Sequence, residues 1–127
     1  MLHLGLFQNF MGETDTLLLS GEPADIVELS HSLGDFAASR SLSWRVHSHK
    51  HISAANAVEL FASRVVLPDS TGFAWLCSPK SLPSIQHKLQ SLLSSGSGHQ
   101  YFDLVGTSVS LVVSVGEYSD SWWSGGA

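Results

Sequence analysis

The chain of 127 residues is poor in charged residues, in cysteine and in long apolar runs. Charged residues make up 13% of it, about half the usual share, whereas the hydrophobic content of 43% is ordinary for a folded protein. One cysteine excludes an internal disulfide framework and fits a reducing compartment, so we expect a cytoplasmic protein. No apolar run approaches the roughly 18–20 residues of a membrane helix, and residues 1–7 lack the basic start of a secretion signal. We therefore expect neither a membrane span nor a leader.

Basic residues are absent from the first part of the chain. The net charge is −5, and no lysine or arginine precedes Arg40. An acidic surface repels phosphate backbones and attracts a basic protein, so we expect a protein partner and no nucleic acid. The low overall charge also favours self-association, which leaves a homodimer open. The acidic residues that we place on the candidate partner surface are Asp25, Glu28 and Asp35, with a purely solvating role as the alternative.

Residues 16–66 and 73–118 share one order of predicted elements. Each segment starts with an apolar strand, enters a helix through a proline (Pro23 or Pro79) and continues into two further strands. One constant offset relates the matching residues, which are Ile26, Ser32 and Leu33 in the first copy and Ile85, Ser91 and Leu92 in the second. A solenoid needs at least about three repeats, so the pattern predicts two fused βαββ units that share one core.

Apolar residues spaced three and four apart mark the two helices. The first begins at Pro23 and continues for about four turns, and the second covers 81–95. Residues 107–118 alternate between apolar and small polar side chains, which is typical of an antiparallel strand covered on one face. We therefore expect a single α+β domain over 1–127. It contains one mostly antiparallel sheet with both helices packed on one face, and a polar tail at 119–127.

Histidines alternate at the end of a predicted strand over 41–49. His47 and His49 lie ~6.6 Å apart along a strand and on one face, where two imidazoles can converge on one metal ion. His51 lies too far away for the same ion, so a ligand from a neighbouring strand, Asp103 or His99, is needed. Polar residues also collect at strand ends without any ligand. We expect no metal and no other cofactor, with His47 and His49 as the candidate ligands if a metal binds.

Cys77 ends a predicted strand just before the second helix, where a helix dipole can stabilise a thiolate. Ser20 takes the matching place in the first repeat, and no Asp–His pair lies nearby in the sequence. The chain also lacks a phosphate-binding loop, a nucleophile elbow and a paired CxxC motif. These observations favour a protein without catalytic activity over a small Cys77-dependent enzyme.

Two further surfaces are candidates for binding. The tail carries Asp120, Trp122 and Trp123, and tryptophan is a favoured interface anchor. Alternatively, one of these tryptophans folds back and caps the sheet. The second surface is the sheet face without helices, which suits an interface or a small ligand and is expected to present Arg45, His47, Tyr101, Asp103 and Ser110.

The second half of the chain, with Tyr101-Phe102-Asp103-Leu104 followed by 110–118 and its Gly-Glu step, resembles the small acidic immunity proteins that bacteria make against their own polymorphic toxins. The resemblance implies a single α+β domain that binds and blocks one cognate toxin without a cofactor. Together with the acidic charge, it points to a basic toxin domain as the partner. The alternative from another class is a small-ligand or metal-binding module that uses the His47/His49 face.

Overall fold

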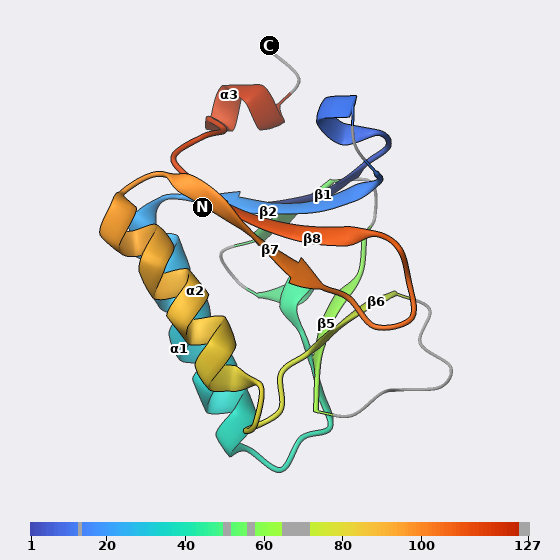
Figure 1. Ribbon diagram of the computed structural model, residues 1–127, viewed down its shortest axis with the longest axis vertical. Helices are drawn as coiled ribbons and strands as arrows, with labels where there is room; N and C mark the ends of the chain where they lie inside the picture. Colours follow the sequence, from blue (N-terminus) through green and yellow to red (C-terminus); the bar gives the residue numbers. More distant parts are fainter. Residues whose placement is uncertain (13, 50–51, 56–57, 65–71, 125–127) are drawn as a thin grey trace.

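The computed structural model describes residues 1–12, 14–49, 52–55, 58–64 and 72–124 (Figure 1). Its elements, in chain order, are β1 (Leu2–Phe7), the 3-10 turn η1 (Phe10–Gly12), β2 (Thr16–Gly21), α1 (Pro23–Ala38), β3 (Ser43–Arg45), the 3-10 turn η2 (Val46–Ser48), β4 (Ile52–Ala54), β5 (Leu60–Ser63), β6 (Phe73–Leu76), α2 (Leu82–Ser95), β7 (Gly98–Asp103), β8 (Ser110–Val115) and α3 (Asp120–Trp123). The chain is therefore α+β. Within the described residues, no helix has the length and apolar character needed to cross a membrane.

Local signals account for both long helices. At the start of α1, the side chain of Glu22 accepts the backbone N–H of Asp25, and the side chain of Asp25 accepts the backbone N–H of Glu22. Pro23 suits the first turn because an N–H at that position has no partner within the helix. Helix α2 ends at Gly96, whose φ of +80° suits a residue without a side chain. The proline in its first turn is Pro83, so the expectation that Pro79 opens this helix is wrong.

The strands form two sheets instead of one. The larger sheet has the order β4-β1-β2-β8-β7, and the smaller has the order β3-β5-β6. Parallel pairs (β1 with β4, β2 with β8, β5 with β6) occur beside antiparallel pairs (β1 with β2, β7 with β8, β3 with β5). The prediction of a single, mostly antiparallel sheet is therefore wrong. Long connections through helices separate several of the paired strands along the chain, and such connections allow parallel pairing.

Helices α1 and α2 lie side by side against one face of the larger sheet, with α1 next to β2 and α2 next to β7 and β8 (Figure 1). This agrees with the prediction that both helices pack on one face. The smaller sheet closes the same core, and the ring of Trp75 in β6 lies 5.1 Å from the ring of Phe102 in β7. The backbone N–H of Val105 also donates to the carbonyl oxygen of Ala74. One continuous core therefore joins both sheets and both helices.

The strands that the repeat makes equivalent occupy different places. β2 lies at the centre of the larger sheet, whereas β6 lies at the edge of the smaller one. A short strand and a 3-10 turn follow α1, whereas the hairpin of β7 and β8 follows α2. The two helices correspond to each other, but the strands next to them do not, so the internal duplication stays a prediction. Parts of the first repeat, at 50–51, 56–57 and 65–66, lie outside the described residues.

Candidate functional site

The face of the larger sheet opposite α1 and α2, here called the helix-free face, is defined by the strand register. Paired residues of neighbouring strands point to the same side of a sheet. Three rows of side chains therefore cross this face: His3, Ser20, Ser114 and His99; Gly5, Leu18, Val112 and Tyr101; and Phe7, Thr16, Ser110 and Asp103. The rows combine polar, aliphatic and aromatic residues, and their central members on β2 and β8, such as Leu18, Ser20 and Ser114, are buried.

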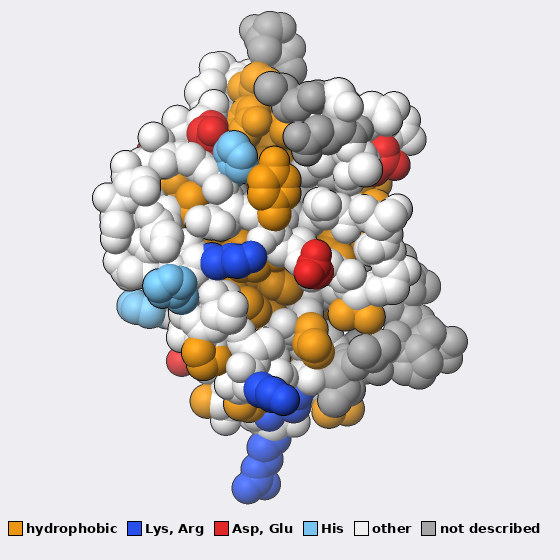
Figure 2. Space-filling model, in the orientation of Figure 1, with side chains coloured by type: hydrophobic (Ala, Val, Ile, Leu, Met, Phe, Trp, Pro, Cys, Tyr) orange, Lys and Arg blue, Asp and Glu red, His pale blue; other side chains and the backbone are white. Residues whose placement is uncertain are grey.

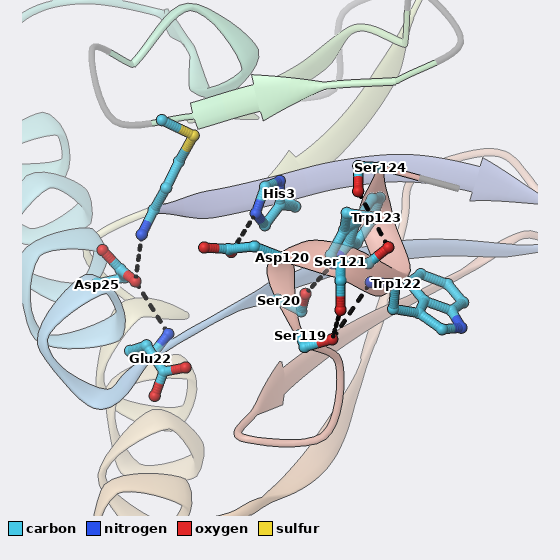
Figure 3. A network of polar contacts seen from close by, with 11 residues as sticks. His3, Ser20, Glu22, Asp25, Ser119, Asp120, Ser121, Trp122, Trp123 and Ser124 are labelled. Atoms are coloured by element: carbon cyan, nitrogen blue, oxygen red, sulfur yellow. Dashed lines mark hydrogen bonds and ion pairs between the residues drawn. The ribbon is translucent and has the colours of Figure 1, made fainter. Parts of the chain in front are cut away.

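Helix α3 lies over β1 and β2 on the helix-free face (Figure 3). The Trp123 ring stacks on the His3 ring with centroids 5.2 Å apart, and its Nε1–H donates to Ser20 Oγ over 2.7 Å. A Cβ atom at Gly5 would lie only 2.9 Å from Trp123, so glycine leaves the room that this indole needs. The Asp120 carboxylate lies 2.8 Å from His3 Nε2. Of the two roles considered for the tail tryptophans, Trp123 therefore takes that of capping the sheet.

A chain of aromatic contacts links α3 to η1. We call Phe7, Phe10, Tyr118, Trp122 and Trp123 the aromatic cluster. The Trp122 ring lies 4.6 Å from the Tyr118 ring and 5.4 Å from the Phe7 ring, and the rings of Phe10 and Tyr118 lie 5.9 Å apart. Trp122 and Trp123 are half-buried. The cluster therefore forms a raised aromatic wall along one side of the helix-free face.

A pocket of about 250 Å³ separates this wall from β7. Its lining comes from η1, β2, β7, β8 and the segment after β8, and consists of Phe10, Thr16, His99, Tyr101, Val112, Glu117 and Tyr118. Tyr101 is 48% exposed and lies at the rim. Figure 2 shows hydrophobic, histidine and acidic side chains gathered in the upper half of the view, over β7 and α3. This pocket is the best-defined candidate site on the helix-free face.

The charge of the pocket comes from Glu117. Its carboxylate accepts a 2.6 Å hydrogen bond from Ser114 Oγ and lies 3.0 Å from His99 Nδ1. Burial raises the pKa of Tyr118 above its ordinary value, and the charge of Glu117 raises it further, followed by Tyr101. The Tyr118 hydroxyl therefore stays neutral at physiological pH. The pocket combines one fixed negative charge with neutral aromatic rings.

The histidine run does not form a strand ladder. The strand ends at Arg45, and the chain then enters η2, where the N–H of His49 donates to the carbonyl oxygen of Val46. His47 Nδ1 lies 3.1 Å from both the backbone nitrogen and the carbonyl oxygen of Leu60. His49 instead lies beside Trp44, with ring centroids 5.7 Å apart. The prediction that His47 and His49 share one strand face is therefore wrong, because the chain leaves the extended conformation after Arg45 and makes a 3-10 turn over 46–48.

No set of three metal-ligating side chains comes together in the part of the chain that the structure describes. His51 lies outside the described residues. Arg45 and His47 belong to the smaller sheet and the turn that follows it, whereas Tyr101, Asp103 and Ser110 lie on the helix-free face. The surface that was expected to hold all five residues is therefore divided between two parts of the molecule.

The acidic residues of α1 have separate surroundings. Asp25 caps the helix and its Oδ2 lies 3.0 Å from the amino group of Met1, so its carboxylate is already paired. Glu28 is half-buried. Asp35 is exposed and borders a second pocket, of about 360 Å³, that also contains Trp44 and His49. Most of α1 lies on the other side of the larger sheet from α3 (Figure 1), so Asp35 and the tail do not form one surface.

Cys77 is fully buried in the core, and its N–H donates to the carbonyl oxygen of Ser63 over 2.7 Å. Burial raises the pKa of its thiol to about 12. A thiol with this pKa is protonated at neutral pH and is a poor nucleophile. The environment of Cys77 therefore matches that of a structural cysteine.

Two parts of the site were not predicted from the sequence. Helix α3 is too short for a periodic pattern, although Ser119, whose side chain accepts the N–H of Trp122 over 3.2 Å, is a recognisable N-cap. The pairing of His99 with Glu117 joins residues on opposite sides of a hairpin and has no local signal.

Comparison of the chain with known proteins finds no matching family model, no matching curated protein and no matching solved structure.

The contact between α3 and β1 is expected to depend on pH. The hydrogen bond with His3 lowers the pKa of Asp120 below its ordinary value of 3.8. Burial opposes this shift, and the charges of His3 and of the terminal amino group add to the lowering. Because the pKa is lowered on folding, the stabilisation is fully present above pH 3.8 and is lost as the pH falls through the lowered pKa. The indole N–H resonance of Trp123 should therefore shift on acidification before the core unfolds. Asp120→Asn should remove this transition, and an identical acid response in both proteins would contradict the role of the carboxylate.

Proposed function

We propose that this chain is a non-enzymatic protein-binding domain that recognises a basic partner through the helix-free face. The observation that carries the proposal is the distribution of charge. The elements that build this face (β1, η1, β2, β7, β8 and α3) contain no lysine or arginine. They or their connections contribute the carboxylates of Asp103, Glu117 and Asp120. An acidic face of this kind steers a basic partner towards the domain.

The aromatic side chains on this face suit the centre of an interface. Tyr101 is 48% exposed, and Trp122 is only half-buried although it has four aromatic neighbours. Tyrosine and tryptophan are enriched among the residues that contribute most to binding, because they bury a large area at a small cost in side-chain entropy. The rings are held in place before binding, which lowers the entropy lost in the complex.

The more specific form of the proposal is an immunity protein that neutralises a cognate bacterial toxin in the cytoplasm. Three features support it: the acidic helix-free face, the similarity noted for residues 101–118, and the buried thiol of Cys77, which argues against cysteine catalysis. The unpaired cysteine also suits a reducing compartment. A basic domain of a toxin-like protein encoded immediately upstream is the partner to test first.

Binding kinetics with that partner test the proposal. Association should slow as salt rises, because steering charges are screened over about 8–10 Å at ordinary ionic strength. Asp103→Lys should lower the association rate constant, and Tyr101→Ala should speed dissociation and weaken binding by about 30-fold, equivalent to ~2 kcal/mol. Surface plasmon resonance at several salt concentrations measures both rate constants.

Two control variants locate the interface. Lys80→Ala changes an exposed residue of the turn before α2 and should leave both rate constants unchanged. Asp35→Lys makes the same charge reversal as Asp103→Lys, but on α1. If Asp35→Lys slows association and Asp103→Lys does not, the partner binds the acidic surface of α1 and the proposal for the helix-free face is wrong.

A second candidate function is small-ligand binding at the pocket beside α1. Asp35, Trp44 and His49 border this pocket, and His49 Nε2 lies 3.4 Å from Ser32 Oγ. The indole ring of Trp44 and the hydroxyl groups of several serines line this open pocket, and such a lining suits a polar small molecule. Such a ligand would shift the NMR resonances of Trp44 and His49, whereas a partner on the helix-free face would shift those of Tyr101 and Tyr118.

A further inference from the structure

We infer that the 250 Å³ pocket between β7 and the aromatic cluster accepts an organic cation, namely the ammonium or guanidinium group of a lysine or arginine side chain of the basic partner. The identity of the cation's source rests on the proposed protein-binding function. The chemistry of the pocket itself is independent of that function and can be tested without any partner.

Three aromatic rings line the pocket, each from a different segment. Tyr101 comes from β7, Phe10 from η1, and Tyr118 from the segment after β8. The ring of Trp122 packs against the ring of Tyr118, with centroids 4.6 Å apart. The faces of aromatic rings carry partial negative charge and attract cations within about 6 Å of the ring centroid. A cation in the pocket would therefore meet rings that are already in place.

Glu117 supplies the full negative charge. Ser114 and His99 hold its carboxylate in position, with Oε1 engaged at 2.6 Å and 3.0 Å and Oε2 at 3.2 Å from His99 Nδ1. Each carboxylate oxygen can accept more than one hydrogen bond, so capacity remains for a further donor. After burial, the charge of Glu117 is the next cause that raises the pKa of Tyr118, whose ring also lines the pocket.

Lys88, which contacts β7, does not occupy this place. Lys88 of α2 donates from Nζ to the carbonyl oxygen of Tyr101 over 2.8 Å and lies 5.0 Å above the ring of Phe102. The Phe102 side chain points to the core side of the sheet, opposite to the Tyr101 side chain. The ammonium of Lys88 therefore lies at the edge of β7 on the helix side. No lysine or arginine is among the described residues that line the pocket, so a partner can supply the cation.

Other ligand classes fit the lining less well. An anion would meet Glu117 without any arginine or lysine to bind it. A metal ion would find only Glu117 and His99 as strong ligands, fewer than the three or four that a stable site requires. The volume is below the ~300–1,000 Å³ of pockets that enclose whole cofactors or drug-sized ligands. It suits the end of a long side chain.

Small probes test the pocket directly. N-acetyl-arginine methylamide and N-acetyl-lysine methylamide should produce saturable shifts in the amide resonances of Tyr101, Val112 and Tyr118. The matched neutral probe is N-acetyl-citrulline methylamide, which has nearly the shape of arginine and no charge, and it should bind at least ~5-fold more weakly. NMR titration of the isotopically labelled protein measures the dissociation constants. Equal binding of the charged and neutral probes would overturn the inference.

Two variants link the cation to its contacts. Glu117→Gln keeps the shape of the side chain and should weaken binding of the arginine probe by ~5-fold or more, and Tyr101→Ser, at an exposed position, should weaken it by ~3-fold. Glu59→Gln removes the same charge at an exposed residue just before β5 and should leave the dissociation constant unchanged. Equal losses in Glu117→Gln and Glu59→Gln would show that net charge alone attracts the probe, which would overturn the site.

The partner assay separates the two proposals. If the wild-type domain binds its partner but Glu117→Gln leaves that affinity unchanged, the inference that the partner supplies the cation is overturned and the proposed function stands. If the arginine probe binds the pocket and no protein partner is bound through the helix-free face, the proposed function is wrong and the cation specificity of the pocket stands.

Discussion

Leu33→Ala and Leu92→Ala should each lower the free energy of unfolding by about 2–5 kcal/mol. The two leucines come from α1 and α2, are 0% and 3% exposed, and belong to the same core. Each replacement removes apolar contacts and leaves a cavity that the neighbouring helix cannot fill without moving. Urea unfolding followed by circular dichroism measures the change.

The control for this pair is Val27→Ala, which lies on α1 but is 40% exposed and should change the free energy of unfolding by less than ~0.5 kcal/mol. The close approach of the helices around Gly34, where a Cβ would lie 3.4 Å from Gln86 of α2, leaves little room for α2 to shift. A loss below 1 kcal/mol for both leucine variants would contradict the packing of the two helices in one core.

Trp75→Ala should lower the free energy of unfolding by about 3–5 kcal/mol, the largest single effect expected in this chain. Trp75 is the largest fully buried side chain, and its ring is the contact between the smaller sheet and Phe102 of the larger one. Its loss removes more buried area than a leucine does and also removes the ring contact between the two sheets. Thermal and urea unfolding of the variant give the change in stability.

The neighbouring residue provides a matched control for Trp75. Leu76→Ala lies in the same strand, is 37% exposed, and should cost far less. Trp75→Phe keeps an aromatic ring and should recover part of the lost stability. If Trp75→Ala and Leu76→Ala were equally destabilising, the two sheets would not depend on this contact.

The sequence was sufficient to predict the helices and insufficient to predict the sheets. A helix is fixed by residues three and four apart, so Ile26, Leu29 and Leu33 mark the buried face of α1 without knowledge of the rest of the chain. Strand pairing joins distant residues, and nothing near β2 in the sequence indicates that it lies parallel to β8. Alternation also misled at residues 41–49, because buried Val46 followed by polar His47 suits a 3-10 turn as well as a strand.

The candidate site was predictable only in part for the same reason. Tyr101 and Asp103 follow from the alternation of a strand, and both lie on the helix-free face. The pocket also needs Phe10 and Tyr118, which are far apart in the chain and meet because α3 folds back onto β1. That fold-back depends on Gly5 making room for Trp123, a contact between residues at the two ends of the sequence.

The position of Lys88 has a consequence for the solubility of the domain. β7 is a terminal strand of the larger sheet, and the outer backbone groups of such a strand can pair with a strand of another molecule. The ammonium of Lys88 occupies the outward carbonyl of Tyr101, near the middle of this six-residue strand. Because the chain has few charges, the ammonium of Lys88 is important at this edge: it makes pairing of β7 with a strand of another molecule less favourable. Replacement of Lys88 by alanine is therefore expected to make the protein aggregate more readily, although the residue lies outside the helix-free face.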